Sequence, residues 1–281
     1  MATRGKIRVA AIQLRSGVEP AANRAVAEPL LREAAMEGAR IIYTPECTTR
    51  LDRKRERLLP ALRPESDDPE IGAWGKLAAE LGVWLSLGST LVSAPDGRAF
   101  NRSILYASNG KIAARYDKIH LFDAALGAGE NYRESATFAP GGEAVSAEGP
   151  AGAKLGLTVC YDMRFPELYR ALALQGADII SVPSAFTRPT GQAHWEILLR
   201  ARAIETGAFI VAAAQGGTHE DGRATWGHSI IVGPWGEVVK KFDHDEPGAL
   251  IADLDLDEVE SARAKIPAWN ALQSFAGKAG A

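Results

Sequence analysis

The sequence has few cysteines and none of the long hydrophobic runs of membrane proteins. Cys47 and Cys160 are the only cysteines among 281 residues, too few for a disulfide framework or for a cysteine-based zinc or iron–sulfur site. No stretch approaches the roughly 18 to 20 apolar residues that a membrane helix needs. The first residues lack the apolar core and cleavage pattern of a signal peptide. We therefore expect a soluble protein of the cytoplasm, with no membrane partner.

The chain also lacks an excess of charge of either sign. Its 32 lysines and arginines face 35 aspartates and glutamates, which gives a formal net charge of -3. Such a chain has no overall electrostatic field that would attract nucleic acid or an anionic membrane. Nucleic acid is therefore not expected as a partner.

Signatures of metal and nucleotide sites are missing as well. The histidines contain no His-x-x-x-His pair and have little cysteine or carboxylate clustering around them, so no metal site is expected. The pair Gly141-Gly142 lacks the strand-then-helix context of a nucleotide-binding loop. The sequence therefore implies no cofactor.

The chain does have the alternating pattern of a layered α/β protein. Hydrophobic residues make up 46% of the chain and charged residues 24%, close to average globular composition. Apolar runs that predict buried strands alternate with amphipathic stretches that predict helices. The predicted strands cover residues 6–14, 40–44, 83–92, 99–107, 111–116, 153–159, 178–182, 208–214, 228–232 and 237–242. The predicted helices cover residues 20–38, 166–175 and 192–206.

The same pattern predicts one domain followed by a short tail. No proline-rich, serine-rich or low-complexity linker divides the chain, which favours a single domain over residues 1–266. Residues 267–281 are expected to form an irregular tail, because Pro267, Gly277 and Gly280 disfavour a packed helix. We expect this tail to lie extended on the surface or against another subunit.

Cys160 stands at a predicted strand-to-helix turn, after the apolar run 155–159 and before a helix that begins at Pro166. Such turns often carry nucleophiles, because they can expose a thiol and aim backbone N–H groups at a developing oxyanion. A lone cysteine is often a buried packing residue instead. The position of Cys160 alone leaves both interpretations open.

Glu46 and Lys118 also follow apolar runs that predict strands. At the end of such a run, partial desolvation of the Glu46 carboxyl group would raise its basicity, and a solvated loop glutamate is the alternative. Lys118 alternates with apolar neighbours and would place an ammonium group among them. An ordinary lysine on an edge strand is the alternative for Lys118.

Taken together, the segments 44–46, 116–118 and 158–162 resemble the glutamate, lysine and cysteine motifs of the nitrilase, or carbon-nitrogen hydrolase, superfamily. The resemblance covers nearly the whole chain, because residues 194–205, 212–216, 227–229 and 234–236 also match. The Tyr161-Asp162 pair after the cysteine is similar to the branch of the deaminated-glutathione amidases, whereas true nitrilases usually have Trp-Glu there. The related ω-amidases tend to have alanine where Pro166 stands.

This resemblance implies a four-layer αββα sandwich that commonly forms homodimers or larger homo-oligomers. It also implies Glu46 as general base, Cys160 as nucleophile and Lys118 as the cation that holds the oxyanion. These roles agree with general chemistry, because a carboxylate can take the thiol proton and an ammonium stabilises negative charge. An acyl thioester would form on the cysteine, ammonia would leave, and water would release the acid.

The family often has a second glutamate about sixteen residues after the lysine, and Glu134 matches it in spacing and context. Glu130 is the competing residue, but the Pro140-Gly-Gly segment that follows also matches the family and favours Glu134. The resemblance implies that Glu134 orients Lys118 and the substrate amide. The N–H of Tyr161, next to the nucleophile, is a natural second donor to the oxyanion.

Arg164 is the cation nearest to the cysteine in sequence that could meet a carboxylate of the substrate. Its planar guanidinium can form two hydrogen bonds to a carboxylate, which fixes orientation as well as adding affinity. The alternative is that Arg164 pairs with Asp162 or Glu167 and only holds the turn. Arg133 and Arg188 are then the substitute anchors.

We therefore predict a cofactor-independent amidase that cleaves a non-peptide carbon–nitrogen bond of a small, carboxylate-bearing amide. Deaminated glutathione is the leading substrate, with an ω-amide of a keto-dicarboxylate or an N-carbamoyl amino acid as alternatives. A non-catalytic binding or scaffold protein with the same fold is the rival of another class. The mechanistic rival is a Cys–His dyad between Cys160 and one of the five histidines, which are His120, His194, His219, His228 and His244.

Overall fold

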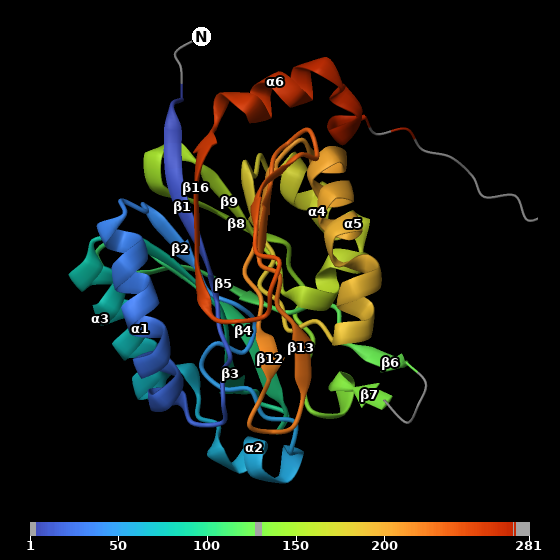
Figure 1. The fold of residues 1–281 in the computed structure, drawn as a ribbon. Coiled ribbons are helices and arrows are strands. Elements are labelled where there is room, and N and C mark those ends of the chain that lie inside the picture. The colour runs from blue at the N-terminus through green and yellow to red at the C-terminus, as the bar shows by residue number, and fades with distance from the viewer. Residues whose placement is uncertain (1–3, 127–130, 272, 274–281) are drawn as a thin grey trace, which may run out of the picture.

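Two six-stranded β-sheets form the centre of the computed structural model, which describes residues 4–126, 131–271 and 273 (Figure 1). The first sheet has the strand order β16 (Gly248–Asp255), β1 (Lys6–Gln13), β2 (Ile41–Tyr43), β3 (Trp84–Ser93), β4 (Ala99–Tyr106) and β5 (Ile112–Asp117). The second has the order β15 (Val238–Lys241), β14 (Ile230–Val232), β11 (Phe209–Ala212), β10 (Ile179–Ser181), β9 (Lys154–Leu157) and β8 (Val145–Glu148).

Both sheets follow one pattern, in which three parallel strands are flanked by antiparallel ones. The parallel strands are β1, β2 and β3 in the first sheet and β9, β10 and β11 in the second. Strands β16, β4, β8 and β14 pair antiparallel with their neighbours. The rhythm that repeats along the sequence therefore corresponds to a repeated sheet pattern.

Helices cover the outer face of each sheet. Figure 1 shows α1 (Pro20–Met36) and α3 (Pro69–Leu81) beside the first sheet, and α4 (Pro166–Leu174) and α5 (Arg188–Thr206) beside the second. The predicted four-layer αββα sandwich is thus confirmed. The remaining elements are α2 (Arg55–Ala61), α6 (Asp257–Lys265), the hairpins β6 (Asp123–Ala125) with β7 (Asn131–Arg133) and β12 (Gly216–Thr218) with β13 (Ala224–Trp226), and short 3-10 turns.

Strand β1 shows how the sequence produces these layers. Val9 and Ala11 belong to a buried cluster with residues of β9, β10 and β11, between the two sheets. Ala10 and Ile12 belong to a second cluster, which includes Trp74 of α3. Because successive side chains of a strand point to opposite faces, a strand inside four layers must be apolar on both faces. This requirement explains the continuous apolar runs in the sequence.

Most predicted elements are present with small shifts at their ends, and the largest shift is at α5. This helix begins at Arg188, whereas the sequence pattern predicts a start at residue 192. Pro189 stands in its first turn, where a missing N–H costs nothing. Gly191 then passes so close to Trp226 that an added Cβ would lie 2.2 Å from that ring. The helices α2, α3 and α6, the strands β8 and β16, and both short hairpins were not predicted.

The segment predicted as an irregular tail begins with a short packed turn. Pro267–Asn270 form a 3-10 turn, η5, and the guanidinium of Arg263 lies 4.7 Å from the ring centre of Trp269. The carbonyl of Ala271 accepts a hydrogen bond from Arg170 of α4. Of the later residues the structure describes only Gln273.

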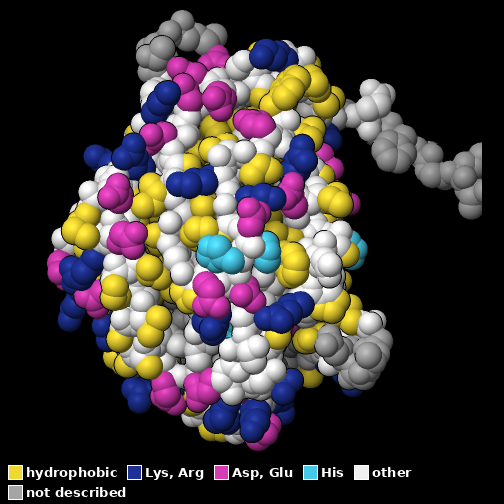
Figure 2. Space-filling view, in the orientation of Figure 1, with side chains coloured by type: hydrophobic (Ala, Val, Ile, Leu, Met, Phe, Trp, Pro, Cys, Tyr) yellow, Lys and Arg dark blue, Asp and Glu magenta, His cyan; other side chains and the backbone are white. Residues whose placement is uncertain are grey.

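The surface carries charges of both signs, interspersed over the face that Figure 2 shows. This distribution agrees with the small net charge of -3. None of the helices among the described residues is long and apolar enough to cross a membrane.

Candidate active site

Glu46, Lys118 and Cys160 come together just beyond the ends of three strands. Glu46 follows β2, Lys118 follows β5 directly, and Cys160 follows β9. All three residues are buried, with exposed fractions of 5%, 2% and 8%. The ends of strands in layered α/β proteins commonly carry the ligand site. The alternative of a solvated Glu46 is therefore wrong. Lys118 does follow the edge strand β5, but it is buried and is not an ordinary surface lysine.

The backbone at Cys160 has a conformation that L-residues rarely adopt. Its φ of 50° lies in the left-handed region, which is strained for a residue with a Cβ. Its N–H donates to the carbonyl of Pro183 at 2.8 Å. Cys160 opens the 3-10 turn η4 (Cys160–Arg164), which leads into α4. The predicted strand-to-helix turn at the cysteine is thus present.

Close backbone packing fixes the segment that carries Glu46. An added Cβ on Gly88 would lie 1.9 Å from the carbonyl oxygen of Thr44, so only glycine permits this approach. The side-chain amide of Gln215 donates to the backbone carbonyl of Glu46 at 3.0 Å. These contacts fix the segment of Glu46 between Gly88 of β3, in the first sheet, and Gln215, which follows β11 of the second sheet.

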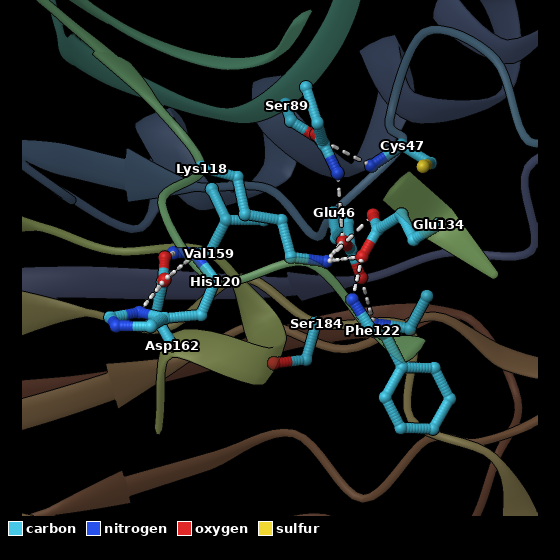
Figure 3. Close-up of polar contacts among 12 residues, drawn as sticks. Glu46, Cys47, Ser89, Lys118, His120, Phe122, Glu134, Val159, Asp162 and Ser184 are labelled. Carbon is cyan, nitrogen blue, oxygen red and sulfur yellow. Dashed lines mark hydrogen bonds and ion pairs between the residues drawn. The ribbon is translucent and has the colours of Figure 1, made fainter. Parts of the chain in front are cut away.

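The ammonium of Lys118 lies between two carboxylates (Figure 3). Its Nζ lies 2.9 Å from Oε1 of Glu46 and 2.9 Å from each carboxylate oxygen of Glu134. The N–H of Phe122 donates to Oε2 of Glu134 at 2.5 Å. Because an ammonium has three N–H donors, these three oxygens account for all of them.

Glu46 accepts further hydrogen bonds on both oxygens. Nδ2 of Asn101 donates to Oε1 at 2.9 Å, and the N–H of Ala185 donates to Oε2 at 3.0 Å. The thiol of Cys160 lies in the same small pocket as this carboxylate, whose charge acts on it. The hydrogen bonds therefore hold Glu46 in one orientation.

The electrostatics of this cluster correct one expectation. Burial raises the pKa of Glu46 and is the largest single influence, but the charge of Lys118 and the polar groups of Cys160, Lys118 and Asn101 together outweigh it and lower the pKa overall. The predicted effect of desolvation is therefore present, but the raised basicity expected from it is not. The favourable interactions with the ionised form together exceed the cost of burying it.

The lysine and the cysteine shift in the opposite direction. Burial lowers the pKa of Lys118, but the charges of Glu134 and Glu46 raise it well above its ordinary value. Burial and the charge of Glu46 raise the pKa of the Cys160 thiol, and the charge of Lys118 only partly opposes them. At neutral pH the site therefore holds a carboxylate at Glu46, an ammonium at Lys118 and a protonated thiol at Cys160.

Asp162 links the cysteine turn to the segment that carries Lys118. Its Oδ2 accepts the N–H of Val159 at 2.9 Å and the hydroxyl of Tyr116 at 2.7 Å. Its Oδ1 accepts the N–H of His120 at 3.0 Å and lies 2.7 Å from the Nδ1 of that ring. Asp162 thus fixes His120, which stands two residues after the lysine.

The structure offers no support for a Cys–His dyad. Over residues 4–126, 131–271 and 273, no hydrogen bond joins the thiol of Cys160 to a histidine, and the charge of Glu46 acts on it. His120 is bound to Asp162 instead.

The described residues 4–126, 131–271 and 273 contain no group of three or more histidine, cysteine, aspartate or glutamate side chains that could hold a metal ion.

Two connected cavities give access to the site. The first, here called the thiol pocket, has a volume of about 60 Å³ and contains Cys160. The second, here called the outer cleft, has a volume of about 700 Å³ and does not include the cysteine. Their shared lining residues are Glu46, Phe122, Tyr132, Glu134, Thr187 and Arg223. A substrate can therefore extend from the sulfur into the larger space.

Tyr161 and Arg164 both line the thiol pocket. The guanidinium carbon of Arg164 lies 5.8 Å from the ring centre of Tyr161 and 5.4 Å from that of Phe186. No ion pair joins Arg164 to Asp162 or Glu167, all of which the structure describes. The alternative in which Arg164 only holds the turn through such a pair is therefore wrong.

The other residues raised by the sequence fall in different places. Arg133 and Arg188 line the outer cleft rather than the thiol pocket. Cys47 is buried, and its backbone N–H donates to the hydroxyl of Ser89 at 2.7 Å rather than to a residue of the cluster. Glu130, the competitor of Glu134, lies outside the described residues.

Sequence reasoning missed Asn101, the N–H of Ala185 and Arg223. A signal for Asn101 was present, because it shares the inward face of β4 with Ala99 and is a polar residue at a buried strand position. Such a residue needs a hydrogen-bond partner, here Glu46. For Ala185 and Arg223, which stand in loops, no local pattern gives comparable information.

The fold and the site are those of an enzyme, a hydrolase that presents a buried thiol beside a carboxylate. The model of the carbon-nitrogen hydrolase family matches residues 8–264, and the chain belongs to this family. The sequence-based predictions of the superfamily, the fold class and an amidase-type enzyme are confirmed.

Individual relatives agree with this assignment. The deaminated glutathione amidase of Yersinia enterocolitica is 41% identical over 263 residues, which cover 92% of this chain and 90% of that protein. The C. elegans NitFhit protein aligns with a TM-score of 0.85 and 35% identity over 95% of this chain, which spans 65% of the NitFhit chain. A mutant amidase from Nesterenkonia sp. AN1 aligns with a TM-score of 0.77 and 28% identity over 95% of this chain and 98% of that one. That structure shows covalent addition of the acetamide moiety of fluoroacetamide at the active site cysteine.

Proposed function

We propose that the chain hydrolyses a small, carboxylate-bearing amide through a thioester on Cys160, with deaminated glutathione as the leading substrate. The observation that carries this proposal is the placement of the Cys160 thiol and the Glu46 carboxylate in one small pocket, with the ammonium of Lys118 bound to that carboxylate at 2.9 Å. A thiol that stays protonated needs a base at the moment of attack. Glu46 is ionised and lines the same pocket as the thiol.

In the first half of the reaction, the sulfur of Cys160 attacks the amide carbonyl carbon while Glu46 accepts the thiol proton. The carbonyl oxygen becomes an oxyanion, which Lys118 and the N–H of Tyr161 stabilise. Glu46 then returns the proton to the amide nitrogen as the carbon–nitrogen bond breaks. The products of this half are an acyl thioester and a free amine.

In the second half, Glu46 takes a proton from water, and the resulting nucleophile attacks the thioester carbonyl. The oxyanion forms again at Lys118, the carbon–sulfur bond breaks, and the thiolate of Cys160 regains the proton. The acid leaves and the resting site is restored. The same three groups therefore serve both halves.

Glu134 acts on this chemistry through the lysine. Because all three donors of Lys118 already bind carboxylate oxygens, an oxyanion must replace one of the oxygens of Glu134. Glu134 keeps a second partner in the N–H of Phe122. This arrangement lets the ammonium turn toward the substrate while it stays held by at least one carboxylate.

The leaving group follows from the substrate. A primary amide releases ammonia, as expected from the sequence. In deaminated glutathione the cleaved amide nitrogen carries a dipeptide, so the amine released is cysteinylglycine. Support for this substrate comes from the 41% identical deaminated glutathione amidase and from Arg164 in the wall of the thiol pocket.

The decisive experiment compares turnover of deaminated glutathione, 2-oxoglutaramate, an N-carbamoyl amino acid and a nitrile, with both ammonia and free amine measured. We expect the highest kcat/KM for deaminated glutathione and no turnover by the Cys160→Ala variant. Intact-mass measurement after rapid quenching should show the acyl group on the cysteine-containing peptide. Full activity of the alanine variant, or a higher kcat/KM for the nitrile, would contradict the proposal.

We also propose that the chain works in the cytoplasm as a homo-oligomer. Support for self-association comes from apolar side chains exposed on the outer face of α5 and on the adjacent turn between β14 and β15. Ile197 is 71% exposed, Ile204 57% and Trp235 56%. Exposed apolar patches of this kind often mark contacts with another protein, and a second copy of the chain is the proposed partner.

A further inference from the structure

Arg223 lies at the junction of the two cavities, although nothing in the sequence pattern marks it. It stands at the end of the loop between β12 and β13, immediately before Ala224. It lines both the thiol pocket and the outer cleft. Any substrate that extends from Cys160 into the outer cleft passes this residue.

The guanidinium of Arg223 is only partly paired. Its Nη2 lies 3.3 Å from Oδ2 of Asp221, and its buried Nε has no hydrogen-bond partner. The carboxylate of Asp221 also accepts the backbone N–H groups of Arg53 and Arg223, each at 2.9 Å. Asp221 therefore holds the loop, and it leaves donors of Arg223 available to a ligand. A buried unpaired donor is rare enough in folded proteins to need an explanation.

The other charged groups around this position are paired with one another, although Glu46 and Glu134 bring two negative charges to the one positive charge of Lys118. Lys118 lies between Glu46 and Glu134. Asp52, a further acidic residue of the outer cleft, is paired with Arg57 at 2.6 Å. Four arginines, Arg53, Arg133, Arg188 and Arg223, line the outer cleft beside three carboxylates, Glu46, Asp52 and Glu134. An anionic ligand would therefore meet an excess of one positive charge among these side chains.

The size of the outer cleft indicates which side of the amide Arg223 meets. The thiol pocket, at about 60 Å³, has room for a small acyl group next to Arg164. A primary amide has only an amino group on its other side and would leave the cleft of about 700 Å³ unused. A substituted amide would place its amine portion in the cleft.

We propose that Arg223 is a specificity-determining residue that binds a carboxylate on the leaving-amine side of the scissile bond. The preferred substrates are then amides whose amine portion is an amino acid or a short peptide with a free carboxyl terminus. Arg164 meets the acyl side of the same substrate. This inference rests on the proposed hydrolysis at Cys160.

The test uses three substrates with one acyl group. The first is deaminated glutathione, whose leaving amine has a terminal carboxylate. The second is the same compound with that carboxylate converted to a carboxamide. The third is 2-oxoglutaramate, which has no substituent on the amide nitrogen. We would measure kcat and KM for the wild type, Arg223→Met and Arg223→Lys. Arg32→Met is the control for loss of one positive charge, because Arg32 pairs with Glu28 and Glu80 at the surface.

We expect Arg223→Met to lower kcat/KM for deaminated glutathione about tenfold to a hundredfold, the usual range for a charged hydrogen-bonded contact. The change should appear mainly in KM, because the carboxylate lies away from the reacting carbon. The carboxamide and 2-oxoglutaramate should change less than about twofold. Arg223→Lys should recover part of the loss, since an ammonium keeps the charge but not the planar fork.

Several outcomes would overturn the assignment. An equal loss on all three substrates would make Arg223 a residue that only holds the loop. If the wild type hydrolyses 2-oxoglutaramate but does not prefer deaminated glutathione over its carboxamide, the role of Arg223 would be overturned. The amidase proposal would then stay intact. No turnover of any amide by the wild type would overturn the proposed function itself, and this inference with it.

Discussion

The thiol of Cys160 and the carboxylate of Glu46 share one small pocket, in which both residues are less than a tenth exposed. The pocket thus pairs a group whose pKa is raised with a base whose pKa is lowered. Proton transfer at rest is therefore unfavourable. It becomes favourable as the sulfur bonds to the substrate and the developing oxyanion is stabilised by the nearby ammonium.

The two cysteines should differ sharply in their contribution to activity. Cys160→Ala removes the nucleophile and should abolish turnover, whereas Cys47→Ala should keep most of it. Both cysteines are buried, so burial alone does not distinguish them. Steady-state kinetics of the two variants test this directly. Alkylation without substrate, followed by peptide mapping, should label Cys160 first, and preferential labelling of Cys47 would contradict the assignment.

Glu46→Gln should lower kcat by about a hundredfold or more, because the amide cannot accept the thiol proton. The fold should survive, since Lys118 keeps both contacts with Glu134. Thermal melting monitored by circular dichroism checks the fold, and single-turnover kinetics check the chemistry. Near-wild-type kcat in this variant would show that another group acts as the base.

Lys118→Ala should affect stability as well as activity. The substitution leaves Glu46 and Glu134 facing one another in a buried site without the cation between them. Removal of one partner from a buried ion pair typically costs about 3–5 kcal/mol. We expect denaturant unfolding to show a loss of this order, and the double variant Lys118→Ala with Glu134→Ala should recover part of it. An unchanged free energy of unfolding would mean that the three charges do not interact strongly.

The strand ends that carry the cluster could be predicted from sequence, but their meeting could not. Glu46, Lys118 and Cys160 each follow an apolar run, and this local pattern marks a strand end. Glu46 and Lys118 are 72 residues apart in the chain and follow two strands of the first sheet that are not neighbours. Cys160 follows a strand of the second sheet, so its meeting with them depends on how the two sheets stack. Only the resemblance to a family indicated that these ends lie together.

Some missed elements had local signals, and others had none. Helix α3 begins after Asp68, whose side chain accepts the N–H of Glu70, and it ends before Gly82 in the left-handed conformation. Both are standard helix boundaries. Strand β16 is different, because it pairs with β1 from the far end of the chain, with Lys6 opposite Asp255. No short-range pattern specifies such a pairing.

The lowered pKa of Glu46 predicts how stability depends on pH. A carboxyl group whose folded pKa lies below its unfolded value contributes stability above the unfolded pKa, here about 4.5. This contribution is lost as the pH falls through the folded value. Unfolding measured between pH 7 and pH 3 should therefore show a fall in stability below pH about 4.5 that is shallower in Glu46→Gln. Identical pH profiles for the two proteins would contradict the shift.

Arg164→Met should remove a preference for an acidic acyl group. Arg164 lines the thiol pocket, and both of its Nη atoms lie 3.4 Å from Nδ1 of His194 rather than beside Asp162 or Glu167. Its charge can therefore meet a substrate carboxylate. We would compare kcat/KM for an amide with a free acyl-side carboxylate and for its neutral methyl ester. The variant should lose about tenfold or more on the acid and little on the ester. A loss of equal size on both, or a fall in melting temperature, would make the residue structural.

The exposed apolar face of α5 should mediate self-association, and a matched pair of substitutions can test this. Ile204 on α5 and Val26 on α1 are both 57% exposed, but only Ile204 neighbours the other exposed apolar residues of the proposed interface. Glutamate at an interface would have to be desolvated without a partner, which opposes association. At an isolated surface position the same charge stays in water and costs little. Light scattering at micromolar concentration should therefore show a 30.0 kDa monomer for Ile204→Glu and an oligomer for Val26→Glu and the wild type. A monomeric wild type, or equal behaviour of the two variants, would count against this interface.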